Sequence, residues 1–181
     1  MSHPLESIPA ALRSRVFVWL LIATTVLFFL FRFIGPDNPN IVQFEMAGSV
    51  TNSQAIVDAW NPVDRIHAGF SLGIDYLFMP VYSTALALAC VLVTGVSTSK
   101  RWRSIGRLLA WGAWFAAIFD AIENLALLKI LFDLNAIDSW PQIAATCATI
   151  KFTLIAIGII YALVGLAARF IRRNNSQTIA A

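Results

Sequence analysis

"VFVWLLIATTVLFFLFRFI", residues 16–34, is long enough and apolar enough to cross a lipid bilayer as a single helix. The hydrocarbon core of a bilayer is about 30 Å thick and requires roughly 20 helical residues. Three more segments of the chain satisfy this requirement, and they are residues 66–96, 105–132 and 140–170. Apolar and polar residues do not alternate with a period of two, so a β-barrel is not indicated. The sequence therefore predicts an all-α integral membrane four-helix bundle, with residues 1–181 forming one membrane domain.

The composition supports a lipid environment. Hydrophobic residues make up 59% of the chain and charged residues only 13%, with a mean hydropathy of +0.74. Soluble domains carry about 25% charged residues, which is more than this chain has to cover a surface in water. The net charge of +3 does not indicate nucleic acid, because the basic residues gather at the ends of the apolar segments. We expect the lipid bilayer to be the main partner, and no nucleic acid.

The charged residues in the connections predict how the chain threads the membrane. Basic residues flank one side of the four segments: Arg13, Arg15, Lys100, Arg101, Arg103, Arg107, Arg169, Arg172 and Arg173. Acidic residues dominate the other connections: Asp37, Glu45, Asp58, Asp64, Asp133 and Asp138. Because basic connections stay in the cytoplasm, both termini are expected there, in a multi-pass protein of the cytoplasmic (inner) membrane.

The connection at residues 35–65 is the one sizeable stretch outside the predicted spans. Within it, "TNSQAIVDAW" (residues 51–60) has the pattern of a short helix capped by Thr51 or Ser53. Such a helix could lie on the membrane surface as a lid over the bundle. An ordered connector without that role is an equally good interpretation.

Polar residues interrupt three of the four apolar segments. "FDAIENLALLKIL" (residues 119–131) carries Asp120, Glu123 and Asn124, while Asp75 and Lys151 lie in the second and fourth segments. At 1.5 Å per residue, and with alternating directions, these residues reach one layer in the outer half of the bilayer. We therefore expect Asp120 to lie within one water molecule of Asp75 or Lys151.

Ionisable residues inside a membrane are costly and mark candidate functional sites. Four of them suit acid–base catalysis, and they are Asp75, Asp120, Glu123 and Lys151. Four neighbours are candidates for ligand binding: Asn124, Tyr76, Tyr82 and Ser71. Three carboxylates against one lysine would leave excess negative charge, which protons or a cationic ligand must offset. The alternative is that these residues only hold the helices together through interhelical hydrogen bonds.

Three functions are compatible with such a site. The first is an outer-leaflet pocket for a small amphiphilic or lipid-like ligand, with acid–base catalysis left open and hydrolysis disfavoured by the lack of GxSxG. The second is a non-catalytic subunit or assembly factor of a larger membrane complex, and the third is an ion- or proton-coupled transporter. A transporter with so few spans would need a homo-oligomer. Neither a cofactor nor a metal is predicted, because HExxH, zinc, P-loop and GxGxxG patterns are missing.

Three motifs carry a resemblance to a known group of proteins. "FEMAG" (residues 44–48), "FSLGIDYLFMPVY" (residues 70–82) and "FDAIENLALL" (residues 119–128) resemble small uncharacterised bacterial four-span integral membrane proteins. The resemblance implies a bacterial inner-membrane protein with four spans. It implies no activity and assigns no catalytic residue.

Overall fold

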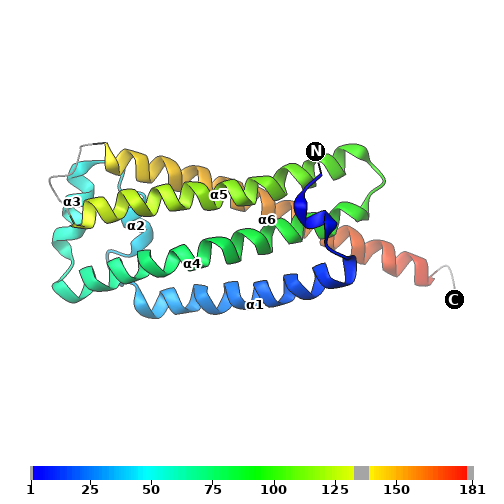
Figure 1. Ribbon diagram of the computed structural model, residues 1–181, viewed down its shortest axis with the longest axis horizontal. Coiled ribbons are helices and arrows are strands. Elements are labelled where there is room, and N and C mark those ends of the chain that lie inside the picture. The colour runs from blue at the N-terminus through cyan, green and yellow to red at the C-terminus, as the bar shows by residue number, and fades with distance from the viewer. Residues whose placement is uncertain (1, 133–138, 179–181) are drawn as a thin grey trace.

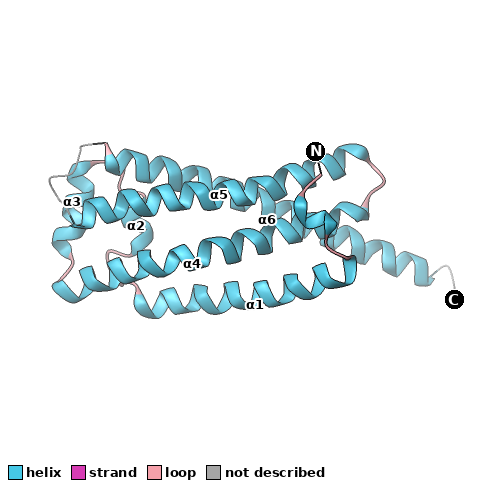
Figure 2. Ribbon diagram, viewed as in Figure 1, coloured by secondary structure: helices cyan, strands magenta, loops and turns pink. Residues whose placement is uncertain are grey.

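The computed structural model describes residues 2–132 and 139–178, and all regular structure in them is helical (Figure 2). In chain order the elements are η1 (Pro4–Ser7), α1 (Ala10–Ile34), α2 (Ile41–Glu45), α3 (Val50–Ala59), α4 (Pro62–Val93), η2 (Thr94–Val96), α5 (Lys100–Phe132) and α6 (Trp140–Thr178). The long helices α1, α4, α5 and α6 lie side by side and alternate in direction (Figure 1). The predicted all-α class is confirmed.

Three of the long helices contain segments that are long and apolar enough to cross a membrane. These segments are Ala10–Phe31, Pro62–Val96 and Trp140–Arg172. The helix α5 has a comparable length but is not among them, and it carries the polar residues Asp120, Glu123 and Asn124. The turn that was expected to be acidic, with Asp133 and Asp138, lies outside the described residues.

The start of α4 is determined by local capping rather than by hydropathy. The side chain of Asn61 accepts hydrogen bonds from the backbone amides of Val63 (2.8 Å) and Asp64 (3.0 Å). The Asp64 carboxylate accepts from the Asn61 amide in return, and Pro62 occupies the first turn. The helix therefore begins at Pro62, one turn before the predicted residue 66.

Residues 35–61, which we call the cap, form an ordered cover at one end of the bundle (Figure 1). The predicted short helix is present as α3, but Ser49 caps it, accepting from the Asn52 amide at 3.2 Å. Thr51 and Ser53, the predicted caps, lie inside the helix. The cap is folded into the bundle, because its residues Phe44 and Trp60 are buried against α4 and α5.

The bundle has two apolar cores, one at each end. At the capped end, the core joins the cap to α4, α5 and α6 and consists of Phe44, Val57, Trp60, Ala68, Leu72, Ala126, Leu127, Ile130 and Ala144. The opposite end, which we call the terminal end, holds the N-terminus (Figure 1). Its core consists of Leu5, Leu86, Ala87, Leu88, Cys90, Val91, Val93, Ala110, Ala113 and Tyr161. Polar residues lie between the two cores.

The helix α1 stands at the edge of the bundle. It packs mainly against α4, whereas α5 packs closely against both α4 and α6. None of its residues with a described side chain is buried, and Trp19 and Phe33 are largely exposed. Because α1 does not pack tightly on α6, side chains of these two helices line a hollow beside α4.

Candidate functional site

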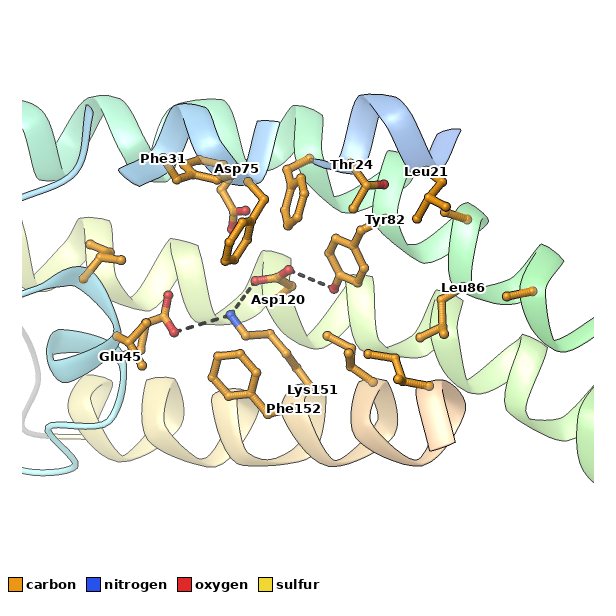
Figure 3. Close-up of a pocket in the computed structure, with 18 of the residues that line it drawn as sticks. Leu21, Thr24, Phe31, Glu45, Asp75, Tyr82, Leu86, Asp120, Lys151 and Phe152 are labelled. Carbon is orange, nitrogen blue, oxygen red and sulfur yellow. Dashed lines mark hydrogen bonds and ion pairs between the residues drawn. The ribbon is translucent and has the colours of Figure 1, made fainter. Parts of the chain in front are cut away.

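A single lysine lies at the centre of the polar residues. The Lys151 ammonium, from α6, donates to Asp120 Oδ1 and Glu123 Oε1 of α5, both at 2.8 Å. A third carboxylate, Glu45 of the cap, lies 3.7 Å from the ammonium (Figure 3). All four side chains are buried. Three carboxylates, two from α5 and one from the cap, therefore converge on a single lysine.

Asp120 connects this ion cluster to α4. Its second oxygen, Oδ2, accepts a hydrogen bond of 2.9 Å from the Tyr82 hydroxyl (Figure 3). Tyr82, Asp120 and Lys151 therefore form a continuous hydrogen-bonded row across α4, α5 and α6. The depth of these residues along the sequence predicted Asp120 to lie within one water molecule of Asp75 or Lys151, and the structure brings Asp120 into direct contact with Lys151.

Asp75 belongs to a second polar group beside the first. The Asn124 amide donates to Asp75 Oδ2 at 2.8 Å and to the Leu72 carbonyl at 3.2 Å. Within the described residues, Asp75 Oδ1 accepts no hydrogen bond and no ion pair reaches this carboxylate. Asp75 is only partly buried and lines the hollow beside α4. One of its oxygens is therefore available to a ligand.

Several buried oxygens in the two polar groups have no hydrogen-bond donor among the described residues. These atoms are Glu45 Oε2, Glu123 Oε2 and Asn124 Oδ1. Buried polar atoms without a partner cost about 1–3 kcal/mol each, so most folds avoid them. If all four carboxylates were ionised, one ammonium would face four negative charges. The cluster therefore needs protons or a further cation for balance.

The sequence interpretation missed Glu45, which it treated as a charge in an outer loop. A capping box at Asn40 and Gln43 starts the single-turn helix α2, and this helix turns Phe44 and Glu45 inward. Burial raises the pKa of the Glu45 carboxyl, and Lys151 partly opposes that change. The one available signal was an acidic residue within the otherwise uncharged "NIVQFEMAG" (residues 40–48).

A cavity of about 640 Å³ adjoins the ion cluster. This volume is within the range of roughly 300–1,000 Å³ that is typical of small-molecule sites. Its polar or charged lining residues are Thr24, Glu45, Ser71, Asp75, Tyr82, Asp120 and Lys151. Its apolar lining residues are Phe17, Leu21, Phe28, Phe31, Ile41, Val42, Leu72, Phe78, Ala85, Leu86, Ala89, Phe152, Ile155, Ile159, Ala162 and Leu163. Most of the wall is therefore hydrocarbon.

The cavity has a polar part and an apolar part. All of its charged residues lie toward the capped end, where Figure 3 shows Glu45, Asp120 and Lys151 close together. From there, apolar side chains of α1, α4 and α6 continue toward the terminal end, as far as Phe17 and Leu163. Phe28 and Leu163 line the cavity yet are 62% and 59% exposed. The cavity is therefore open at the side, between α1 and α6.

The predicted site residues divide into three groups: those that line the cavity, those that lie behind its wall, and Tyr76. Asp75, Asp120, Lys151, Tyr82 and Ser71 line the cavity. Glu123 and Asn124 are fully buried and are not part of its wall, but they bind Lys151 and Asp75 from behind.

Tyr76 is the exception among them. It is 42% exposed, donates to the Ala121 carbonyl at 3.3 Å and does not line the cavity. In a helix, neighbouring residues point in directions about 100° apart, so Tyr76 does not reach the cavity that Asp75 lines.

A metal ion has no evident place in this cluster. Within the part of the chain that the structure describes, no group of three or more His, Cys, Asp or Glu side chains is positioned to hold one. The Lys151 ammonium occupies the centre of the carboxylates, where a cation would otherwise sit. What the arrangement offers instead is a set of proton donors and acceptors beside an apolar channel.

Comparison with known proteins adds no further constraint. No family model, no curated protein and no solved structure matches this chain. The function must therefore be argued from the site itself.

Proposed function

We propose that this chain is a four-span protein of the cytoplasmic membrane that holds one amphiphilic or lipid-like molecule in the cavity between α1 and α6. Both termini would be cytoplasmic and the cap would face the outside. In this orientation the basic residues Lys100, Arg101 and Arg103 lie on the cytoplasmic side, as the positive-inside rule requires. The bacterial family resemblance is compatible with the same topology.

The observation that carries this proposal is the uneven distribution of polar residues along the cavity. A headgroup would contact Asp75, Asp120 and Lys151, while an acyl or other hydrocarbon tail would follow the apolar wall toward Phe17 and Leu163. The side opening between exposed apolar residues lets a ligand enter from the lipid phase without crossing water. Binding sites of small molecules combine apolar walls with a few polar groups in this way.

Photolabelling tests the proposal directly. A single-chain amphiphile with a diazirine in its tail would be added to the protein in lipid nanodiscs, and labelled residues would be mapped by mass spectrometry. We expect labelling at Leu21 and Leu163, which line the cavity. Leu163→Trp should abolish the labelling of Leu21, whereas Val164→Trp, at an exposed position of α6 that does not line the cavity, should not. Uniform labelling of the lipid-facing side chains, with no effect of Leu163→Trp, would contradict the proposal.

The proposed topology has its own test. Cysteine introduced at the exposed positions Thr51 and Ser104 would be probed in intact cells with a membrane-impermeant maleimide. The native Cys90 and Cys147 are buried, which keeps their background labelling low. We expect Thr51→Cys to react and Ser104→Cys to react only after the membrane is opened. The reverse pattern would invert the orientation.

Acid–base catalysis on the bound molecule is a second candidate. The row Tyr82–Asp120–Lys151 lines the cavity and is linked by hydrogen bonds of 2.8–2.9 Å, so protons can be held at defined positions there. An isomerase or cyclase would require this. Incubation with a membrane lipid extract in D₂O should then place deuterium on a carbon atom of one lipid. The incorporation should be lost in Asp120→Asn and kept in Asp58→Asn, a matched change on the exposed cap surface.

The other two functions gain less support. A transporter needs a path to the cytoplasmic side, but Leu88, Val91 and Ala110 fill the terminal end between α4 and α5. A subunit or assembly factor, or a homo-oligomer, would cover the side opening with a helix of another chain. In that case the photolabelling tail would be excluded once the complex forms, and a photoreactive residue introduced in place of Leu163 would crosslink to the partner.

A further inference from the structure

The charge of the cavity residues indicates which headgroup the site can accept, provided that the cavity binds an amphiphile as proposed. The Lys151 ammonium is already engaged by Asp120 and Glu123 at 2.8 Å and by Glu45 at 3.7 Å. An anionic headgroup would have to displace one of these carboxylates and then lie among the others. Like charges in a desolvated site repel strongly, so an anion is disfavoured.

Asp75 is the carboxylate that has capacity for a new partner. Asn124 supplies one hydrogen bond to Oδ2, and within the described residues no ammonium or guanidinium forms an ion pair with Asp75. Glu45 also lines the cavity, and its buried Oε2 atom has no hydrogen-bond donor and only a long, 3.7 Å contact with the Lys151 ammonium. Both groups gain from a donor that carries positive charge, because hydrogen bonds between ions are about twice as strong as neutral ones.

Aromatic rings surround this end of the cavity. Phe31 and Phe78 contact each other with centroids 5.3 Å apart, and Phe78 contacts Tyr82 at 5.0 Å. All three rings line the cavity, Phe31 from α1 and the other two from α4. Figure 3 shows Asp75 on the same side of the cavity as Phe31. Phe152, on the other side, already has the Lys151 ammonium 4.8 Å from its ring centroid. Aromatic faces attract organic cations, most strongly where water is excluded.

We infer that the ligand is a cationic amphiphile, whose positively charged nitrogen headgroup pairs with Asp75 among these aromatic rings. The tail extends along the apolar wall toward the terminal end. A bound ammonium adds a second positive charge, beside that of Lys151, to the four carboxylates. The competing explanation is that protons alone balance the cluster, in which case a neutral headgroup is accepted equally well.

Direct binding measurements with three probes separate these explanations. The probes are dodecylammonium, dodecanol and dodecyl sulfate, which share a tail and differ in headgroup charge. Their binding to the protein in phosphatidylcholine nanodiscs would be measured with radiolabelled probes, with binding to empty nanodiscs subtracted. Wild type would be compared with Asp75→Asn, which preserves the side-chain shape, and with Asp58→Asn, which removes an equivalent charge from the exposed cap surface.

We expect wild type to bind dodecylammonium at least about tenfold more tightly than dodecanol, the effect of one charge-assisted hydrogen bond. Dodecyl sulfate should bind most weakly. Asp75→Asn should lose most of the preference for dodecylammonium while keeping its affinity for dodecanol, which also shows that the variant is folded. Asp58→Asn should match wild type.

Two kinds of failure can be distinguished. Equal affinity for dodecanol and dodecylammonium, or an unchanged preference in Asp75→Asn, would overturn the inferred headgroup while leaving an amphiphile site. Absence of saturable binding for all three probes, together with photolabelling that Leu163→Trp does not change, would overturn the proposed function itself.

Discussion

The two halves of this bundle use the same three helices in different ways. At the terminal end, α4, α5 and α6 are held by apolar side chains, with Gly165 of α6 directly against the side chain of Val93 of α4. Midway toward the capped end, buried carboxylates surround Lys151. The terminal end shows that these helices can pack without buried charge. If the charged cluster had a purely structural role, the free-energy cost of burying its charges would be unexplained. The position of the cluster beside the cavity favours a functional role.

Unpaired polar atoms occur in both halves, but they differ in kind. At the terminal end they are the neutral nitrogens His3 Nε2 and Trp111 Nε1. In the capped half they include carboxylate oxygens of Glu45 and Glu123. Burying an ionised group costs far more than burying a neutral one. The difference predicts that substitutions in the capped half depend on charge and those in the terminal half on volume.

The largest effect is expected from Lys151→Met, which removes the one ammonium from the carboxylates of Asp120, Glu123 and Glu45. A buried charge pair that loses one partner destabilises a protein by about 3–5 kcal/mol, because the remaining charge is uncompensated. The free energy of unfolding would be measured by denaturant titration in mixed micelles. The control Lys129→Met changes an exposed lysine on α5 and should stay within about 0.5 kcal/mol of wild type.

A double variant tests whether charge is the reason. In Lys151→Met/Glu123→Gln, the fully buried carboxylate that contacted the ammonium becomes neutral. We expect the double variant to be more stable than Lys151→Met alone, which is a coupling between neighbours. If the two substitutions each lower the free energy of unfolding and their effects add, then packing of the lysine side chain, not its charge, stabilises the capped half.

In the terminal half, Gly165→Ala should destabilise through volume alone. A Cβ atom at Gly165 would lie 2.5 Å from the Cβ of Val93, whose branched side chain cannot move aside. Overpacking of this kind costs about 1–3 kcal/mol and should not depend on pH. The same substitution at Gly73, where a new Cβ meets nothing within 4 Å, should cause no loss. If Gly165→Ala and Gly73→Ala were equally stable, α4 and α6 would be less tightly packed at Val93 than in this structure.

The two halves also differed in how far the sequence could predict them. Hydropathy predicted the helices of both, and depth counting predicted that Asp120 would lie close to Asp75 or Lys151, without deciding between them. It did not predict Glu45, because the path of the cap is determined by the burial of Phe44 and Trp60 in a distant core. The cavity was predicted only as a polar pocket. Its apolar part exists because α1 does not pack tightly on α6, and no residue pattern reports the spacing between helices.

A smaller, pH-dependent effect is expected at Glu45. Burial raises the pKa of this carboxyl in the folded protein, so the folded state binds its proton more tightly than the unfolded state. Stability should therefore fall as the pH rises above the unfolded value of about 4.3 and level off above the folded pKa. Glu45→Gln removes this contribution, while Asp120, Glu123 and Lys151 stay in place.

Denaturant titration should show that the free energy of unfolding of Glu45→Gln increases relative to that of wild type as the pH is raised. Asp58→Asn, on the exposed surface of the same cap, should follow wild type at every pH. A Glu45→Gln variant that is less stable than wild type at high pH would show that the 3.7 Å contact with Lys151 outweighs the cost of burial.

The smallest effect is expected at the terminal end, where His3 packs between Trp111 and Trp114 with ring centroids 4.9 and 4.6 Å away. Burial lowers the pKa of His3, although the nearby Glu6 opposes this, so the neutral imidazole is favoured in the folded protein. Stability from this contact is lost as the pH falls below the unfolded value of about 6.5. Protonation also removes the Nδ1 acceptor of the Leu5 amide, which lies at 3.2 Å.

Hydrogen exchange in the N-terminal peptide, corrected for its intrinsic pH dependence, should therefore accelerate under mild acid. His3→Asn retains a capping acceptor but cannot titrate in this range, so its exchange should lose the acid step. Persistence of the step in His3→Asn would assign the pH response of the terminal end to another group.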